Sequence, residues 1–305
     1  MALKDVKNRI SSVKNIQKIT RAMEMVAAAR LRRAEQRIEA LRPYAGAIRR
    51  MTRQAAEAAG NVPSLPILNE HESEDTIALL LVTGDRGLAG AFNSQIVRAG
   101  VRAGSQYETE GKSTVWYASG RRGVSSLTFR GRDAKGAYTG FTDRPAYANA
   151  REIASDLMAA YVDGEVDRVE IIYNRYISPL TQEVTRETLL PLQHATILEG
   201  GEGLGGRAAG EEEGQDHGKH ALVEYEPDPD AILERLIPAY VEISIYRALL
   251  ESTASEHGAR MTAMRNASEN AGDIIKDLTL EFNRERQAAI TQEIMEVVAG
   301  AESLV

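Results

Sequence analysis

Both ends of the chain repeat apolar residues at steps of three and four over unusually long stretches. The N-terminal repeat includes Thr20 and the apolar residues Val6, Ile10, Val13, Ile16, Met23, Val26, Ile38, Leu41 and Ile48. This spacing predicts a helix over residues 3–59, in which Gly46 is the single glycine. Gly60 and Pro63 follow in the order typical of a helix end, and Pro43 should bend the helix. At 1.5 Å per residue it would be roughly 80 Å long, more than a compact domain needs.

The C-terminal segment shows the same periodicity. Asp228 can cap a helix, and Pro229 suits its first turn. A narrow apolar stripe then runs through Met261, Met264, Ala267, Ala271, Ile275, Leu278, Phe282, Ile290, Ile294, Val297 and Ala301. One partner helix covers a stripe of this width. We therefore expect the helices 3–59 and 228–303 to pair as an antiparallel coiled coil, with Pro238 kinking the second.

The middle of the chain has a different pattern, with short apolar runs typical of buried strands. These runs are Thr76–Thr83, Ser113–Ala118 and Arg168–Tyr173, and weaker ones follow at Thr185–Leu190 and Ala195–Leu198. Between the second and third, the segment 144–163 has helical spacing, and strand, helix and strand in succession predict a mostly parallel sheet. The fold class is thus α/β with a long antiparallel coiled coil, in which a small Rossmann-like domain is inserted between the two long helices.

We expect four segments: an N-terminal helix over 1–60, an α/β domain over 61–198, a flexible acidic Gly-rich loop over 199–226 and a C-terminal helix over 227–305. Eight of the 22 residues in 199–220 are glycine, too polar a composition to form a core. His217 and His220 in this loop are spaced like metal ligands, but neither carboxylate geometry nor a rigid backbone supports them, so we expect no metal site.

Composition excludes several function classes. The chain has 305 residues and no cysteine, which excludes disulfides, thiol nucleophiles and Cys-ligated metals. It lacks an apolar run of about 18 residues, and its start lacks the apolar stretch of a signal peptide, so we expect a soluble or peripheral protein. Residues 1–59 carry 14 Lys and Arg against 5 Asp and Glu, although the whole chain has a net charge of -7. The basic arm therefore suits nucleic acid, an acidic protein surface or the chain's own acidic part.

A Gly-rich turn at Gly84–Asn93 follows the first predicted strand. Its glycines recur every three residues, which fits neither the dinucleotide pattern nor a P-loop. We favour a structural turn, with Asp85 and Arg86 as an ion pair, over a phosphate cradle. The sequence offers no catalytic constellation, and we expect no cofactor.

The basic cluster of the N-terminal helix comprises Arg30, Arg32, Arg33, Arg37, Arg49, Arg50 and Arg53. No aromatic or Asn/Gln array that reads bases accompanies it, so a solvated or protein-facing surface is favoured over nucleic acid.

Three segments together resemble the gamma subunit of bacterial F-type ATP synthases. They are Ile16–Ala29 (IQKITRAMEMVAAA), Thr83–Leu88 (TGDRGL) and Ala288–Ile294 (AAITQEI). The resemblance implies a rotor shaft, without an active site, that couples proton flow through a membrane c-ring to ATP synthesis and hydrolysis. Implied partners are a hexamer of alpha and beta subunits, the epsilon subunit and the c-ring, with no nucleic acid and no small-molecule substrate. The implied location is peripheral, on the cytoplasmic face of the bacterial plasma membrane.

The resemblance also implies a few functional positions. Met23, Arg286, Gln287 and Thr291 match positions associated with coupling and with contact to the beta subunit. A core role for Met23 and a solvated polar face for the others are the alternatives. Two departures matter: the loop 199–220 is longer than usual, and the absence of cysteine excludes the redox control of chloroplast members.

Two other functions stay open at this point. A coiled-coil protein associated with nucleic acid would use the basic arm, and a nucleotide-binding α/β enzyme would use the turn Gly84–Gly90.

Overall fold

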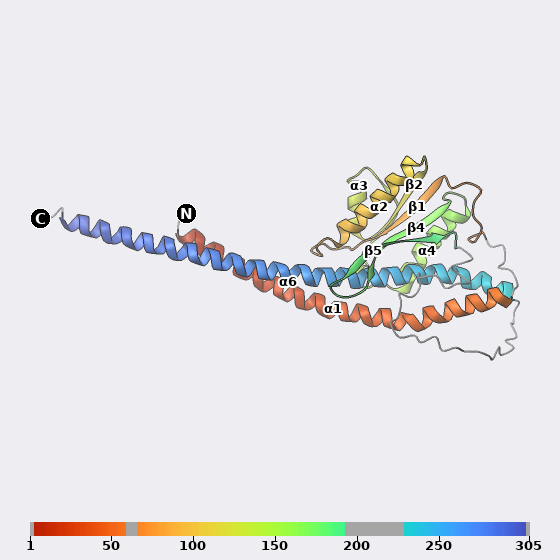
Figure 1. Cartoon of the computed structure of the whole chain (residues 1–305), viewed down its shortest axis with the longest axis horizontal. Coiled ribbons are helices and arrows are strands. Elements are labelled where there is room, and N and C mark those ends of the chain that lie inside the picture. Colours follow the sequence, from red (N-terminus) through yellow and green to blue (C-terminus); the bar gives the residue numbers. More distant parts are fainter. Residues whose placement is uncertain (1–2, 59–65, 193–228, 303–305) are drawn as a thin grey trace. The chain divides into compact units, whose positions relative to one another are not determined.

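The computed structural model describes residues 3–58, 66–192 and 229–302 (Figure 1). They form two compact units, one of Met1–Ala29 with Arg260–Val305 and the other of Arg30–Ala259. The elements are α1 (Leu3–Ala58), β1 (Thr76–Val82), α2 (Phe92–Thr109), β2 (Ser113–Ser119), α3 (Arg121–Thr128), β3 (Ala134–Tyr138), α4 (Tyr147–Val162), β4 (Arg168–Tyr176), β5 (Gln182–Leu190) and α6 (Pro229–Glu302). Helices α1 and α6 contribute residues to both units.

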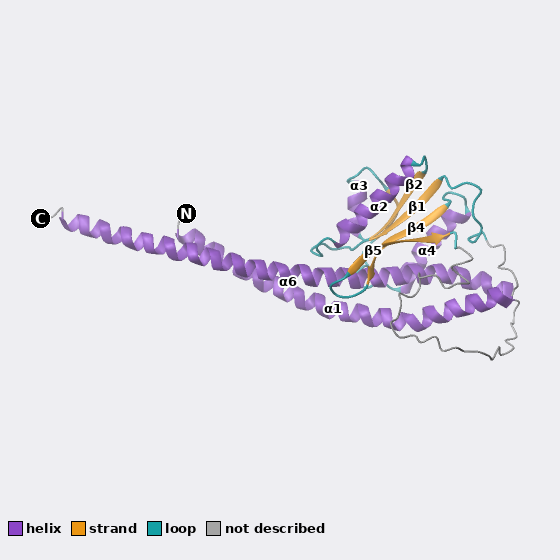
Figure 2. Ribbon diagram, in the orientation of Figure 1, coloured by secondary structure: helices purple, strands orange, loops and turns teal. Residues whose placement is uncertain are grey.

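The second unit is built on a five-stranded sheet of order β3-β2-β1-β4-β5. Strands β1 to β4 are parallel, and β5 pairs antiparallel with β4 at one edge. The sheet carries helices on both faces (Figure 2). This arrangement confirms the predicted mostly parallel α/β domain between two long helices.

The central strand β1 is buried on both faces, because its side chains alternate between two hydrophobic clusters. Ile77, Leu79 and Leu81 pack with residues of α2 and α3. Ala78 and Leu80 point the other way and pack with residues of α4 and α6. A strand covered on both sides has a continuous run of apolar residues, which is why the position of β1 in the sequence was predictable.

Helix α6 crosses the carboxyl edge of the sheet. The Ser252 hydroxyl donates to the carbonyl of Val82 at the end of β1 (3.2 Å), and the Ser255 hydroxyl donates to the carbonyl of Asn174 in β4 (3.1 Å). Gly84, just after β1, lies so close to α6 that a Cβ there would come within 2.7 Å of the Glu256 carboxyl carbon. Every residue from 252 to 258 is buried. The sheet edge is therefore closed by a helix segment that is polar in sequence.

The first unit is an antiparallel pair of helix segments. The Gln17 side-chain amide donates to the Ser268 carbonyl (3.2 Å), and Arg265 pairs with Glu24 (2.9 Å). The buried apolar residues of this unit are Val6, Ala27, Met264, Ala271 and Leu278. The predicted coiled coil is thus confirmed here.

The predicted apolar stripes are only partly covered. Ile290, Ile294 and Val297 are 48%, 57% and 72% exposed, and Ile16 and Val26 on α1 are 52% and 53% exposed. The reason lies in the register: since Gln17 faces Ser268, the first residues of α1 face α6 near residue 282, and α6 continues to Glu302. The expectation that the stripe is covered as far as Ala301 was therefore wrong.

Helices α1 and α6 continue through Pro43 and Pro238, and the bend expected at each stays a prediction. The weak strand signal at Ala195–Leu198, the loop 199–226 and the pair His217 and His220 lie outside the described residues. Three of the described elements had no predicted range: α2, α3 and β3. In β3 only Tyr138 is buried, so this short edge strand lacks an apolar run.

The register of the helix pair predicts a specific cross-link. A Cβ on Gly272 would lie 3.1 Å from the Gln17 side-chain amide, so we expect the double variant Gln17→Cys/Gly272→Cys to be joined by a short bis-maleimide. The measurement is a gel shift or mass spectrometry of the full chain, which has no native cysteine to react. Pairing of the two stripes end to end would place Val13 beside Ile290, and the register shows that expectation to be wrong. Val13→Cys/Ile290→Cys therefore serves as the control. It should stay unlinked, because Val13 faces a point on α6 about 18 residues, or roughly 27 Å, from Ile290. Linking of the control pair alone would contradict the register.

The close packing of Gly84 predicts opposite effects for two glycine substitutions. Gly84→Ala should destabilise the chain by about 1–3 kcal/mol, because the new methyl group would overlap the buried Glu256 carboxylate. Gly46→Ala is the control: its Cβ would meet only the Arg50 guanidinium at 3.5 Å, so helix propensity should stabilise α1 by about 0.5–1 kcal/mol. Urea unfolding followed by circular dichroism measures both. A Gly84→Ala midpoint equal to wild type would show that α6 does not close this edge.

Candidate functional site

The strand order identifies where a ligand would bind if this sheet had one. In open parallel sheets, ligands bind outside the carboxyl ends of the strands, at the point where the strand order reverses. Here the reversal lies between β1 and β4, next to the turn Gly84–Asn93. The geometry of this turn therefore decides whether the domain can act on a nucleotide.

Several backbone donors around the turn are bound to acceptors of the chain itself. The Gly84 N–H donates to the Asn93 side-chain oxygen (2.8 Å), and the Gly123 N–H in α3 donates to the Thr83 hydroxyl (2.8 Å). The Arg121 N–H at the start of α3 donates to the Asp85 carboxylate (3.1 Å). Backbone N–H groups at a helix start are what a phosphate would bind, and these three are already engaged.

Asp85 occupies the place that an anionic ligand would take. Its carboxylate also accepts from the Gly140 N–H (2.9 Å) and the Thr142 hydroxyl (3.0 Å). Burial works against the charged form, but the backbone donors of Gly140, Arg121 and Thr142 outweigh it and lower the pKa of Asp85 below its ordinary value. The residue stays ionised at neutral pH and would repel a phosphate.

The predicted ion pair between Asp85 and Arg86 was wrong. Asp85 is held by backbone donors and lies 3.9 Å from Arg121, whereas Arg86 lies 3.6 Å from Asp143. The physical reason is that backbone N–H groups of a helix start and a loop surround the carboxylate, a better set of partners than one exposed guanidinium. The interpretation of the segment as a structural turn agrees with this geometry.

Glu256 places a second carboxylate against the same turn, from the buried run of α6. With Asp85 on one side and Glu256 against Gly84, the crevice is filled by acidic groups of the chain. Sequence reasoning missed Glu256, because it is 172 positions away from Gly84 and no local pattern marks it.

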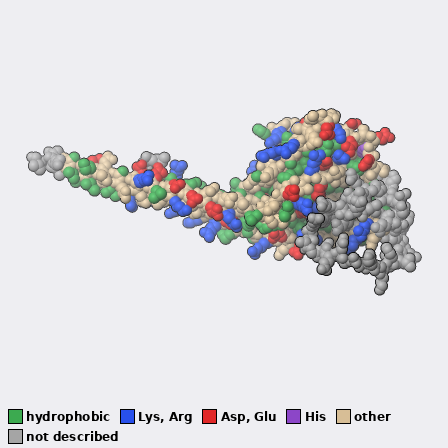
Figure 3. Space-filling view, in the orientation of Figure 1, with side chains coloured by type: hydrophobic (Ala, Val, Ile, Leu, Met, Phe, Trp, Pro, Cys, Tyr) green, Lys and Arg blue, Asp and Glu red, His purple; other side chains and the backbone are tan. Residues whose placement is uncertain are grey.

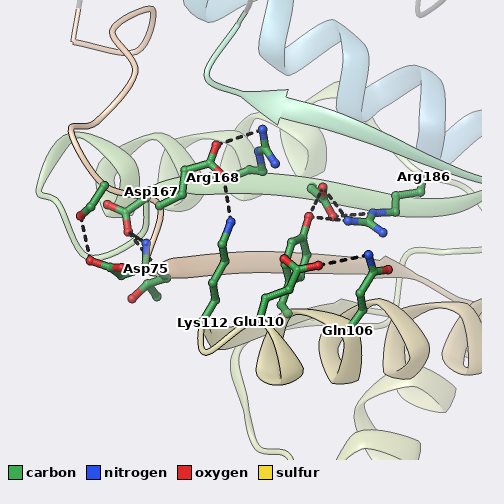
Figure 4. Close-up of polar contacts among 12 residues, drawn as sticks. Asp75, Gln106, Glu110, Lys112, Asp167, Arg168 and Arg186 are labelled. Atoms are coloured by element: carbon green, nitrogen blue, oxygen red, sulfur yellow. Dashed lines mark hydrogen bonds and ion pairs between the residues drawn. The ribbon is translucent and has the colours of Figure 1, made fainter.

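The remaining buried charges of the second unit hold its elements together. Glu170 in β4 accepts from the Tyr107 hydroxyl (2.7 Å) and from Arg186 of β5 (2.7 Å), and Figure 4 shows Arg186 reaching across to this cluster. Burial, and then the Glu170 carboxylate, raise the pKa of Tyr107. Tyr107 therefore stays neutral and donates.

A second cluster lies at the opposite ends of the strands. Lys112 and Arg168 both approach Glu74, at 3.1 and 3.0 Å (Figure 4). Asp167 accepts the Thr76 N–H (2.8 Å) and contacts His71 (2.8 Å). The described part of the chain has no group of three His, Cys, Asp or Glu that could hold a metal ion.

The predicted coupling residues lie in the first unit and fall into two places. Arg286, Gln287 and Thr291 are exposed on α6, beyond the point that α1 reaches. The Thr291 hydroxyl donates to the Gln287 carbonyl (2.9 Å), so its methyl group and the acceptor side of its oxygen are left for contact. Met23 is half-buried on α1 and faces α6 about 22 residues, or roughly 33 Å, from Arg286. The structure therefore places Arg286, Gln287 and Thr291 together and Met23 far from them.

Apolar side chains gather around the end of α6 (Figure 3). Met295 and Val298 are 63% and 48% exposed, in addition to Ile290, Ile294 and Val297. Among the described helices, none is long and apolar enough to cross a membrane. Exposed apolar surface of this kind marks a contact with another molecule.

Comparison with known proteins agrees with this picture of a chain without a catalytic centre. The ATP synthase family profile matches residues 2–304. The ATP synthase gamma chain of Rubrobacter xylanophilus is 42% identical over 304 residues, which cover 99% of this chain and 98% of that one.

Two solved structures are similar in fold. A chain of the central stalk and c-ring structure of the Tetrahymena thermophila mitochondrial ATP synthase has a TM-score of 0.58 at 25% identity, covering 82% of this chain and 99% of that chain. A chain of the Euglena gracilis mitochondrial ATP synthase has a TM-score of 0.66 at 19% identity, covering 99% of this chain and 94% of that one. Sequence and fold thus agree, and the chain belongs to the family of ATP synthase gamma chains.

Proposed function

We propose that this chain is the central rotor shaft of a proton-translocating ATP synthase and transmits rotation between a membrane c-ring and catalytic sites on alpha and beta subunits. As a gamma chain it is a non-catalytic stalk subunit. The observation that carries the proposal is a contrast in burial along α6. Residues 252–258 are buried in the sheet unit, whereas the end of the helix exposes apolar side chains that no described part of the chain covers.

A shaft without catalysis can act only through differential contact. A ligand or partner shifts an equilibrium by binding its states unequally. The helix pair is asymmetric, since α1 and α6 differ in sequence and α6 continues beyond the point that α1 reaches. A rotor with such faces presents a different surface to each catalytic subunit around it.

We assign the partners by surface chemistry and by family. The apolar end of α6 suits an apolar sleeve formed by alpha and beta subunits, and the sheet unit suits the c-ring and the epsilon subunit. The complex would be peripheral on the cytoplasmic face of the bacterial plasma membrane. The filled crevice at Gly84 argues against a nucleotide-binding enzyme.

Arg286, Gln287 and Thr291 are proposed as the contact to the beta subunit, because they are exposed at the unpartnered part of α6. Met23 is proposed to act by packing within the helix pair. The division into segments 1–60, 61–198, 199–226 and 227–305 stays a prediction.

Substitution of Arg286 or Gln287 by Ala tests the coupling contact. Each should lower both ATP synthesis and ATP hydrolysis of the assembled complex, while the stability of the isolated chain changes by no more than about 0.5 kcal/mol, as usual for exposed positions. Turnover assays in both directions and thermal unfolding of the chain are the measurements. Lys276→Ala removes an equally exposed charge from the part of α6 that α1 accompanies, and should leave turnover unchanged. Normal turnover of the Arg286 and Gln287 variants in a normally assembled complex would remove these residues from the contact.

Introduction of a charge at the end of α6 tests the sleeve. Ile294→Glu should reduce recovery of alpha and beta subunits with the tagged chain from native membranes, because a carboxylate would be buried without a partner. Val162→Glu is the control, since Val162 is 49% exposed on α4 and should leave recovery unchanged. Quantitative mass spectrometry of the purified complex measures subunit ratios. Equal recovery with both variants would show that the apolar end of α6 is not enclosed.

A further inference from the structure

The second unit contains a cavity lined by α1, α6 and the segment between β3 and α4. Its volume is about 160 Å³. Four arginines line it, and Asp143 is its single lining carboxylate. The arginines are Arg30, Arg33, Arg37 and Arg144.

The single carboxylate that lines the cavity already has arginine partners. Asp143 accepts from Arg30 at 2.8 Å and lies 3.6 Å from Arg86, outside the cavity wall. Among the residues that the structure describes, Arg33, Arg37 and Arg144 form no ion pair. Three of the lining arginines thus have no carboxylate of their own; Arg33 and Arg144 are exposed and Arg37 is half-buried, so an anion can reach them from solvent.

Four arginines of the unit that pack beside buried side chains have carboxylate partners, whereas exposed ones such as Arg98 and Arg102 form no ion pair among the described residues. The pairs are Arg132 with Glu108, Arg168 with Glu74, Arg186 with Glu170 and Arg247 with Glu187. Like charges four residues apart on a helix, such as Arg33 and Arg37, are destabilising on their own. An anion between them would convert this repulsion into attraction.

Shape and chemistry narrow the class of anion. Guanidinium groups bind phosphate oxygens through paired N–H donors. The buried side chains of Ala34 and Leu250 form an apolar part of the wall, which strengthens charge interactions beside it. Pockets that enclose whole drug-sized ligands measure roughly 300–1,000 Å³, so this cavity suits one or two phosphoryl groups and not an entire nucleotide.

We propose that this cavity binds a phosphoryl oxyanion through Arg33, Arg37 and Arg144. The oxyanion is either free phosphate or pyrophosphate, or the terminal phosphates of a nucleotide whose base and ribose stay outside. The site is separate from the filled turn at Gly84. Occupancy would join α1 to the segment that precedes α4, since Arg33 and Arg37 lie on the first and Arg144 on the second.

Calorimetric titration of the full chain with phosphate, pyrophosphate, ATP without magnesium, and adenosine tests the proposal. We expect saturable binding of pyrophosphate that Arg33→Gln/Arg37→Gln weakens at least about tenfold, the effect of removing about 1.4 kcal/mol of charge-assisted contact. Arg144→Gln should weaken it in the same direction. Arg98→Gln/Arg102→Gln is the matched control, because these two exposed arginines have the same spacing on α2 and should change the affinity less than about twofold.

The ligand series separates the two sources of the oxyanion. Equal affinities for pyrophosphate and ATP would show that the free anion alone is enough for binding. A clear preference for ATP would identify the terminal phosphates of a nucleotide as the ligand. Both results support the site. Thermal unfolding of each variant checks that it is folded. The proposal is overturned if pyrophosphate does not saturate, if both double variants weaken binding equally, or if only an acidic peptide such as poly-glutamate binds to these arginines.

Discussion

Burial of α6 against the carboxyl edge of the sheet is the contact on which the second unit depends. The hydroxyls of Ser252 and Ser255 donate to carbonyl groups near the ends of β1 and β4. The preceding turns of α6 supply Leu233, Ile237 and Ile245 to the cluster under the sheet. Removal of the helix would expose this apolar face and leave buried polar groups unsatisfied.

Charges in the chain separate into two kinds by their surroundings. Inside the sheet unit the buried Arg247 has a carboxylate partner and donates to Glu187 at 2.6 Å. In the same unit Arg33, Arg37 and Arg144 form no ion pair among the described residues, and in the first unit the end of α6 lacks apolar cover. These are the two surfaces for which we propose bound partners.

The sequence predicts best what depends on neighbours along the chain. Strand β1 was located because both of its faces are apolar, and α1 and α6 because their periodicity is long. The exposure of Ile290 was not predictable. Ile290 and Leu278 occupy equivalent positions in the stripe and differ only in whether α1 reaches them. The donors around Asp85 come from positions such as Gly140, 55 residues away. Contacts of that kind leave no local signal.

The contact between Gly84 and Glu256 has a consequence for any attempt to give this sheet a ligand. The carboxyl edge at which open sheets of this kind bind ligands is here the edge against which α6 packs. A substitution that made room beside Gly84 by shortening Glu256 would therefore also remove part of the contact between α6 and the sheet.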